Sequence, residues 1–197
     1  MIASLLGGQN PRVYRKTFHK VYVVIPEESY DSMEINPYEE LKERGQVYHS
    51  LDDLGNLYEI LKENAKRGRQ SFLLIDDFGS ELNGPNMVWL ARLLTKSRHL
   101  RTMICLCLQT HLQLTRDMRR LLECVVLFRP NRDDFYNIMS EKFGNHKLEF
   151  FDKIYDIAYD REHSYLTIHG EYTPPRLYVR SHRLMLDDEH EPDDIEK

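Results

Sequence analysis

Residues 71–78, Ser-Phe-Leu-Leu-Ile-Asp-Asp-Phe, decide the fold class of this chain. An apolar run ends there in two adjacent carboxylates, Asp76 and Asp77. Because residues 72–75 are apolar on both faces, they suit a central strand of a parallel sheet that is covered by helices on either side. The carboxyl ends of such strands border the ligand crevice of open α/β sheets. The two acids therefore predict a ligand site, although a buried strand that enters a solvated turn explains the same residues.

The composition is that of an ordinary globular protein. The chain has 197 residues, of which 41% are hydrophobic and 30% charged, enough for one domain with a sizeable core. No apolar run approaches the ~20 residues of a membrane span, and residues 1–6 are too short for a signal peptide. Cys105, Cys107 and Cys124 fit no metal-ligand spacing, so we expect reduced thiols in the core of an intracellular protein without membrane segments.

The charge of the chain is unevenly distributed. The net charge is −5, yet residues 92–132 carry nine Lys or Arg and only two acids. This basic block is suited to the phosphates of a nucleotide or a nucleic acid, or it forms solvated helix faces. Residues 187–197 carry seven acids and one lysine. We therefore expect one domain over residues 1–183 and an acidic, disordered tail over residues 184–197.

Strand-like runs alternate with helical patterns, which indicates a mostly parallel α/β sheet. Strands are expected at residues 20–25, 72–75, 102–108 and 124–128, the last three as buried strands of one sheet. Helices are expected at residues 50–66 with Ser50 as cap, from Pro85 onward, at 131–143 and at 148–158. Residues 27–38 are expected to be a loop, and residues 112–122 a short basic helix or turn. Two further runs, 165–169 and 176–179, predict a C-terminal hairpin.

Polar side chains follow three of the buried strands. Asp76 and Asp77 end the first, Gln109 ends the second, and Arg129 ends the third. In one parallel sheet these carboxyl ends would share an edge. A carboxylate for a metal ion, a second carboxylate to activate water and a glutamine to sense a γ-phosphate form a coherent set for phosphate hydrolysis.

The chain resembles a family of motor ATPases at these positions. Residues 72–78, followed by Arg98-His99 and an apolar run that ends at Gln109, are similar to the FtsK–HerA ATPases. The similarity is greatest to the DNA-packaging ATPases of large double-stranded DNA viruses and related virus-like elements. The basic helix with Arg119 and the following Cys-Val-Val-Leu-Phe strand are also similar to that group. The Leu-Ile-Asp-Asp-Phe-Gly string resembles helicase-loader and transposase-helper ATPases too, but Arg98-His99 and Gln109 argue against those.

The resemblance implies a P-loop NTPase fold of the RecA/ASCE type, with a mostly parallel sheet flanked by helices and a C-terminal β-hairpin. It implies that Asp76, in the Walker B strand, holds the Mg²⁺ that accompanies ATP, and that Asp77 polarises the attacking water. Gln109 would orient that water or report the γ-phosphate, and Arg119 would act in trans on the nucleotide of a neighbouring subunit.

Each of these roles has a simpler alternative. The two acids can be a solvated strand end, and Gln109 can be an ordinary polar strand terminus. Arg119 can be a helix-surface arginine or a DNA phosphate contact, and Arg116 and Arg120 compete with it for the catalytic role.

By resemblance, the protein forms a homo-oligomeric ring that hydrolyses ATP and moves double-stranded DNA into a capsid. Its partners would be DNA and the capsid or portal proteins. It would act at a virus assembly site in the host cytoplasm or nucleus, or in the virion.

One departure from the family concerns the phosphate loop. The sequence contains no Gly-x-x-x-x-Gly-Lys-Ser/Thr motif, since Gly7-Gly8 is followed by Gln-Asn-Pro. Residues 3–6 resemble the end of the family's first helix, so we expect the loop to precede Met1, and we expect the chain alone to be inactive. The alternatives are a truncated ATPase, a non-catalytic homologue that serves in DNA binding or ring assembly, and a helicase-loader-like ATPase.

Overall fold

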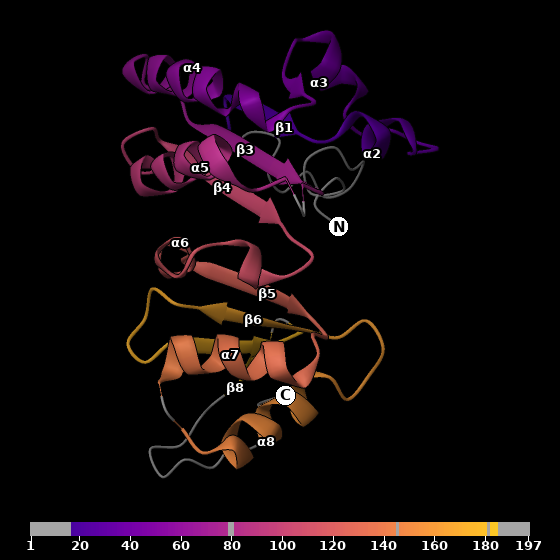
Figure 1. The fold of residues 1–197 in the computed structure, drawn as a ribbon, viewed down its shortest axis with the longest axis vertical. Coiled ribbons are helices and arrows are strands. Elements are labelled where there is room, and N and C mark those ends of the chain that lie inside the picture. Colours follow the sequence, from indigo (N-terminus) through magenta and orange to yellow (C-terminus); the bar gives the residue numbers. More distant parts are fainter. Residues whose placement is uncertain (1–16, 79–80, 145, 181, 185–197) are drawn as a thin grey trace. The chain divides into compact units, whose positions relative to one another are not determined.

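The computed structural model describes residues 17–78, 81–144, 146–180 and 182–184 (Figure 1). The chain divides into two compact units, Met1–Met118 and Arg119–Lys197. Each unit contains its own four-stranded sheet. Three predicted features lie outside the described residues: the helix end at residues 3–6, Gly7-Gly8, and the acidic tail from residue 185 onward.

The sheet of the first unit is entirely parallel. Its strands are β1 (Lys20–Val24), β2 (Val47–Tyr48), β3 (Ser71–Asp76) and β4 (Thr102–Cys107). They are ordered β2-β1-β3-β4, and every neighbouring pair is parallel. The predictions for β1, β3 and β4 are confirmed to within two residues, whereas the two-residue strand β2 was not predicted. A parallel sheet needs a crossover connection between successive strands, and these connections carry the helices of the unit.

Among the described residues, seven helical segments lie in the first unit or cross its boundary. They are α2 (Glu27–Asp31), α3 (Glu39–Glu43), the 3₁₀ turn η1 (Leu51–Asp53), α4 (Leu54–Lys66), α5 (Gly84–Lys96), the 3₁₀ turn η2 (His111–Gln113) and α6 (Arg116–Arg120). The predicted cap is confirmed, because the Ser50 side chain accepts a hydrogen bond from the backbone N–H of Asp52. The prediction of a loop over residues 27–38 is wrong at its start. Pro26 fixes the entry into α2, and two glutamates favour its first turn.

The two faces of this sheet pack against different elements. Phe72 and Leu74 of β3 face a cluster that contains Tyr30 of α2 and Tyr38, the residue before α3. The other face is covered by α4, whose Asn64 side chain donates a hydrogen bond of 2.9 Å to the Tyr22 hydroxyl of β1. The packing therefore covers both faces of β3, as its apolar run predicts.

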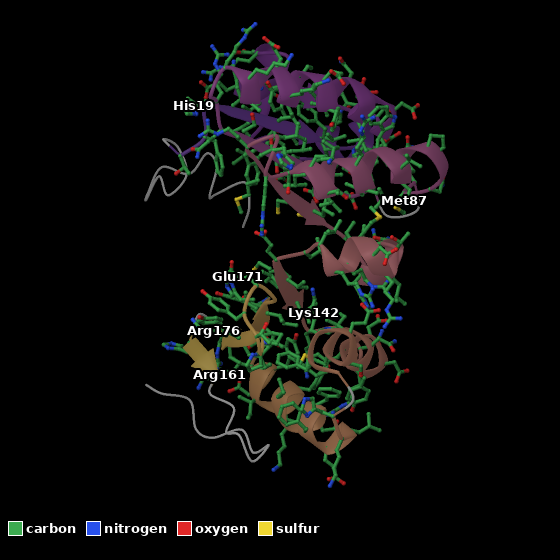
Figure 2. All side chains as sticks on the ribbon, turned by 90° about the vertical axis from the view of Figure 1, so that its left-hand side faces the viewer. His19, Met87, Lys142, Arg161, Glu171 and Arg176 are labelled. Atoms are coloured by element: carbon green, nitrogen blue, oxygen red, sulfur yellow. The ribbon has the colours of Figure 1, made fainter. Side chains whose placement is uncertain are left out.

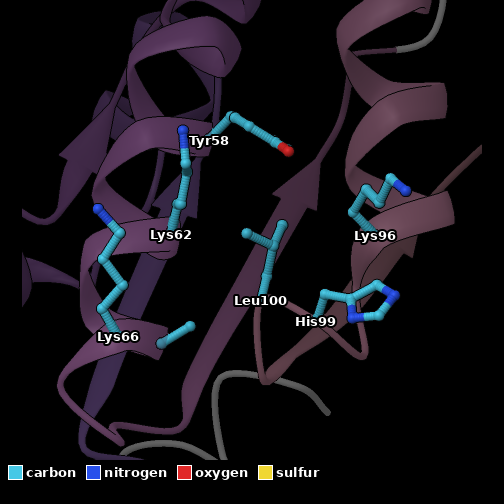
Figure 3. A pocket seen from close by; sticks show the side chains of 7 residues that line it. Tyr58, Lys62, Lys66, Lys96, His99 and Leu100 are labelled. Atoms are coloured by element: carbon cyan, nitrogen blue, oxygen red, sulfur yellow. The ribbon is translucent and has the colours of Figure 1, made fainter.

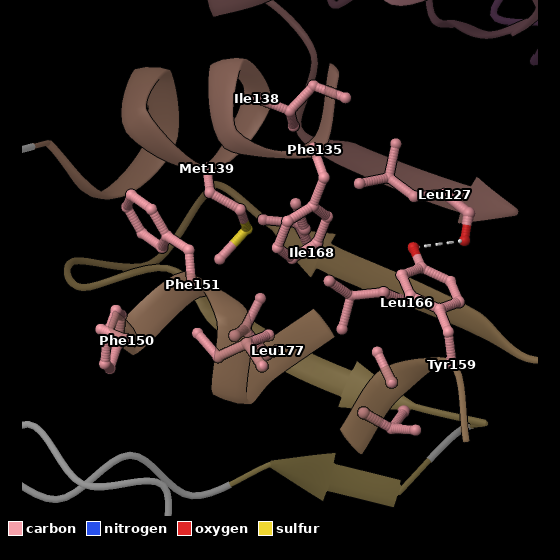
Figure 4. Close-up of a cluster of buried hydrophobic side chains, with 13 residues drawn as sticks. Leu127, Phe135, Ile138, Met139, Phe150, Phe151, Tyr159, Leu166, Ile168 and Leu177 are labelled. Carbon is pink, nitrogen blue, oxygen red and sulfur yellow. Dashed lines mark hydrogen bonds between the residues drawn. The ribbon is translucent and has the colours of Figure 1, made fainter. Parts of the chain in front are cut away.

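The second unit contains an antiparallel sheet and two helices. Its strands are β5 (Cys124–Phe128), β6 (Tyr165–His169), β7 (Arg176–Val179) and β8 (His182–Leu184), in the order β5-β6-β7-β8. Its helices, α7 (Arg132–Phe143) and α8 (Leu148–Ala158), confirm the predicted positions. Phe135 and Met139 of α7 and Phe151 of α8 are buried on the inner residues of the sheet, Leu166 and Ile168 (Figure 4).

The hairpin predicted at the C-terminus is confirmed, but the place of β5 is not. We expected residues 124–128 to be a buried strand of the parallel sheet, and this is wrong. β5 pairs antiparallel with β6, and Val126 and Phe128 are 40% and 59% exposed. Only its alternate residues, Val125 and Leu127, pack into the core of the second unit. A continuous apolar run of this length does not distinguish a central strand from a strand with one covered face.

Among the residues that the structure describes, no helix is long and apolar enough to cross a membrane.

Candidate functional site

The parallel register brings the ends of β3 and β4 together at the carboxyl edge of the first sheet. Asp76, the last residue of β3, lies opposite Cys107, the last residue of β4. Gln109 follows two residues later in the exposed turn between β4 and η2. The structure therefore places Asp76, Asp77 and Gln109 at one edge of one sheet, as the sequence predicts. Arg129 follows β5 and belongs to the antiparallel sheet, so its predicted place in this set is wrong.

Asp76 is half-buried on the face of the sheet that carries the tyrosine cluster. Burial raises the pKa of its carboxyl group, and the neighbouring charge of Asp77 raises it further. Hydrogen bonds from the Cys107 thiol and the Asp77 backbone N–H act in the opposite direction and lower the Asp76 pKa. Burial and the carboxylate of Asp76 raise the pKa of Tyr38 to about 12, so this phenol stays protonated beside the acid. Burial outweighs these two hydrogen bonds, so the pKa of Asp76 stays above its usual value.

Asp77 has a backbone conformation that few residues adopt. Its φ angle is +62°, in the left-handed region that aspartate tolerates better than most residues. The Ser29 hydroxyl of α2 donates a hydrogen bond of 2.6 Å to Oδ2 of Asp77. A carboxylate accepts several hydrogen bonds, so this contact orients Asp77 while its other oxygen can accept one from water. Ser29 is a site residue that the sequence analysis missed.

Tyr38 was not predicted as a site residue either, for the same reason as Ser29. They lie in residues 27–38, which were expected to be loop. The pattern of Pro26 followed by two glutamates is typical of a helix start, and this signal could have identified α2. No local pattern indicates that Ser29 meets Asp77, because the two residues are 48 positions apart.

The two cysteines of β4 lie on the same face as Asp76. Cys105 and Cys107 are half-buried free thiols, and Cys124 is exposed, so the expectation of core thiols is wrong for Cys124. A hydrogen bond with Cys105, burial and the charge of Asp76 all raise the pKa of the Cys107 thiol. Cys107 therefore remains protonated, and its single S–H donates either to Asp76 or to Cys105, in each case lowering the pKa of the acceptor.

The two carboxylates of the acidic edge are too few to hold a metal ion by themselves. They fit a Mg²⁺ ion whose other ligands are waters and the phosphates of a nucleotide. Among the described residues, no group of three or more His, Cys, Asp or Glu could hold a metal ion. Neither Asp76 nor Asp77 makes an ion pair with a described Lys or Arg. Mg²⁺ commonly binds through one or two carboxylates, several waters and the phosphates of a nucleotide. Asp76 and Asp77 fit the protein side of such a site, and the described chain shows no glycine-rich motif for the phosphate side.

Arg119 belongs to the second unit, where it is held by an acid. Its Nε donates a hydrogen bond of 2.8 Å to Oε2 of Glu141 on α7, and its Nη2 donates to the other oxygen. The Arg119 side chain is only 13% exposed. Lys142 (Figure 2) donates to the backbone carbonyl of Arg119 at 3.2 Å and fixes the same turn. Arg116, which competes with Arg119 for the catalytic role, is exposed.

Comparison with known proteins gives similarity in structure and none in sequence. No protein-family model and no curated protein matches the chain. The fold is similar to that of the genome packaging NTPase B204 from Sulfolobus turreted icosahedral virus 2. The TM-score to its complex with AMPPCP is 0.59, at 15% identity over 90% of each chain. For its complexes with ATP-gammaS and AMP the TM-scores are 0.59 and 0.58, at 14% and 16% identity.

At an identity this low, the structural similarity establishes the fold alone. The roles of individual residues have to be argued from the site. The predicted likeness to DNA-packaging ATPases holds at that level, over 89% to 90% of the chain. This protein therefore has the α/β fold of a P-loop NTPase, and its structural neighbours are viral genome packaging NTPases.

Proposed function

We propose that this protein is the ATPase subunit of a DNA-packaging motor, which couples ATP hydrolysis to the movement of double-stranded DNA into a capsid. One observation carries the proposal. The Asp76–Asp77 pair ends a central parallel strand in a fold shared with packaging NTPases whose structures hold AMPPCP, ATP-gammaS and AMP. The carboxyl edge of such a sheet is where α/β folds bind their ligands.

The two carboxylates have different surroundings, which supports different roles. Mg²⁺ bound with ATP supplies positive charge that stabilises the transferring phosphoryl group. Asp76, half-buried and without a cationic partner among the described residues, is the residue that holds this ion. Asp77, which Ser29 orients, accepts a hydrogen bond from the attacking water and polarises it. Gln109, in the exposed turn after β4, orients the same water or senses the γ-phosphate.

Arg119 is the proposed trans-acting residue, and its ion pair sets a condition on that role. Because Glu141 accepts two hydrogen bonds from its guanidinium, Arg119 must leave Glu141 before it can contact a nucleotide on another subunit. In this proposal a neighbouring subunit of a homo-oligomeric ring supplies the nucleotide, and the capsid or portal is the further partner. The site of action is where virus particles assemble inside the host cell.

A non-catalytic homologue is the second candidate function. It is favoured by the sequence itself, because the 197 residues contain no Gly-x-x-x-x-Gly-Lys-Ser/Thr motif. Such a protein would keep the fold for DNA binding or ring assembly. The two site carboxylates favour the ATPase, since neither DNA binding nor assembly needs two adjacent acids at this edge. A helicase-loader-like ATPase is a third candidate, with the same site and a different partner.

The test is ATP turnover, measured on the full-length protein with Mg²⁺ and with and without long duplex DNA. The packaging proposal predicts turnover that DNA stimulates severalfold. DNA binding without turnover would support the non-catalytic homologue. Turnover that responds to a helicase and not to duplex DNA would support the helicase loader.

A further inference from the structure

A second polar site lies in the first unit, away from the acidic edge. A cavity of about 330 Å³ opens between α4 and α5. Its walls are formed by residues of α4, by the last residue of α5 and by the turn before β4 (Figure 3). The lining residues are Tyr58, Lys62, Ala65, Lys66, Lys96, His99 and Leu100. Three of these seven residues are lysines, and none is an acid.

The cavity lies at the opposite end of the sheet from Asp76. Lys66 ends α4 shortly before β3 begins at Ser71, and Leu100 lies two residues before β4 begins at Thr102. Both residues therefore lie at the amino ends of the parallel strands. β3 has six residues, so about 17 Å of strand separates the two ends. A nucleotide phosphate at the acidic edge cannot also occupy this cavity.

The lysines present their charge to solvent without strong internal partners. Lys62 and Lys66 are four residues apart on α4 and so lie on one face of the helix. Lys62 pairs with Glu59 at 3.0 Å and Lys66 with Glu63 at 3.6 Å, and all four side chains are at least 47% exposed. Exposed pairs of this kind are weak and readily exchanged for another anion. Lys96 makes no ion pair with a residue that the structure describes.

The helix ends and turns that carry these three lysines are basic as a whole. Residues 62–70 and 96–101 together carry seven Lys or Arg against one glutamate, a local net charge of +6 in a chain whose total is −5. The two turns contact each other, because Arg101 donates a hydrogen bond of 3.3 Å to the backbone carbonyl of Gly68. The two basic segments therefore lie side by side next to the cavity. A concentrated patch of this sign attracts polyanions and phosphate groups.

We propose that the cavity between Lys62, Lys66 and Lys96 binds a backbone phosphate of duplex DNA, independently of base sequence. Phosphate is the ligand class because three lysines line a cavity that has no carboxylate in its lining. The choice of duplex DNA rests on the proposed function. His99, expected to fix the turn before β4, is exposed on this cavity and adds a polar ring to it.

A simpler explanation applies to two of the lysines. Lys66 and Lys96 are the last residues of their helices, where a cation offsets the exposed carbonyl groups of the helix end. That explanation does not include Lys62, which lies one turn earlier. It also predicts a loss of helix stability on substitution and no change in DNA affinity, so the two accounts can be separated.

The experiment measures the affinity of the full chain for fluorescent 30-base-pair duplexes of two unrelated sequences, without nucleotide, over a range of salt concentrations. The variants are the triple substitution Lys62→Ala, Lys66→Ala and Lys96→Ala, the same three positions changed to arginine, and the control Lys147→Ala. Lys147 is an exposed lysine at the start of α8 and does not line the cavity. Melting curves establish that each variant is folded.

We expect the alanine triple variant to bind both duplexes at least tenfold more weakly near 0.1 M salt. Its slope of log affinity against log salt should be shallower by about 1, because one phosphate fewer is neutralised and fewer counterions are released. The arginine variant and Lys147→Ala should bind like the wild type. Equal affinity of the wild type and the alanine variant would overturn the proposal, as would an equal loss in Lys147→Ala.

Inorganic phosphate separates DNA from a small anion as the natural ligand. If phosphate binds the wild type and requires the three lysines while duplex DNA does not, the cavity is a small-anion site and the DNA assignment is wrong. The failure of the proposed function has a different signature. If the protein binds DNA through these lysines but does not hydrolyse ATP, the DNA site is supported and the proposed ATPase function is wrong.

Discussion

The hydroxyl of Ser29 donates a hydrogen bond of 2.6 Å to Oδ2 of Asp77 and joins α2 to the acidic end of β3. It is a contact between residues 48 positions apart, and it explains how a short helix bears on the candidate nucleotide site. Asp77 also has a positive φ angle, which aspartate tolerates better than most residues. Ser29 is thereby a positioning residue for the proposed water-polarising acid.

Substitution of Ser29 tests this positioning role. We expect Ser29→Ala to lower kcat for ATP by about 3- to 10-fold, which corresponds to the loss of one exposed hydrogen bond worth about 0.6–1.4 kcal/mol. The nucleotide dissociation constant and the melting temperature should change little, because the contact is exposed. Ser29→Thr, which keeps the hydroxyl, should restore most of the turnover. A wild-type kcat in Ser29→Ala would show that Asp77 needs no orientation from α2.

Substitutions at Arg119 and at its partner Glu141 show whether Arg119 has a catalytic or a structural role. If Arg119 acts in trans, Arg119→Ala should lower turnover by about 10³-fold or more. Glu141→Gln frees the arginine and should keep turnover near the wild-type level. Both variants should lose about 1–3 kcal/mol of stability, since each removes or weakens the charge-assisted hydrogen bonds of this partly covered pair. Equal loss of turnover in the two variants, in proportion to their loss of stability, would assign Arg119 a structural role only.

The pKa of Asp76 predicts the sign of a pH effect on stability. Burial raises this pKa above that of an unfolded aspartate. Between the two values the folded chain holds a proton that the unfolded chain releases, so the free energy of unfolding falls as the pH rises through this window. Without nucleotide or Mg²⁺, Asp76→Asn should therefore be more stable than the wild type at pH 7. Its advantage should shrink as the pH falls toward about 3.9. Denaturant titrations at several pH values measure this difference, and a difference independent of pH would contradict the account.

The core of the second unit depends on the aromatic side chains that α7 and α8 contribute. Phe135 is fully buried, and its ring meets Tyr155 edge-on at a centroid distance of 5.1 Å. Phe135→Ala should lower the free energy of unfolding by about 3–5 kcal/mol, because it removes apolar contacts and leaves a cavity. The control Leu148→Ala, at a side chain that is 62% exposed, should change it by less than about 0.5 kcal/mol. Urea unfolding monitored by circular dichroism makes the comparison, and similar losses in both variants would refute the assigned packing.

Local patterns were sufficient to predict most elements of this fold. The apolar run before Asp76, the Ser50 cap and the Asn131 cap each act over a few residues, and the structure places β3, α4 and α7 where they indicate. The position of β5 was not predictable in this way. Its residues fit a central strand by composition, and only the distant partner β6 decides that one of its faces stays exposed.

In the candidate site too, residues marked by local sequence patterns could be predicted, and residues that depend on contacts distant in the sequence could not. Asp76, Asp77 and Gln109 follow strands that the sequence identifies, so parallel pairing was enough to predict their common edge. Ser29, Tyr38 and the partner of Arg119 depend on contacts that join separate elements. Glu141 lies 22 residues from Arg119, and no spacing rule relates positions that far apart.

The central claim is that Asp77 supports hydrolysis at a site that binds ATP. It is tested most directly by ATP turnover of full-length Asp77→Asn, alongside its affinity for a slowly hydrolysed analogue such as ATP-gammaS. Asp31→Asn, which changes an exposed carboxylate of α2, is the matched control. The account predicts that Asp77→Asn binds the analogue like the wild type and loses turnover by at least about 100-fold, while Asp31→Asn binds the analogue and hydrolyses ATP like the wild type. Unchanged turnover in a variant that still binds the analogue would contradict it.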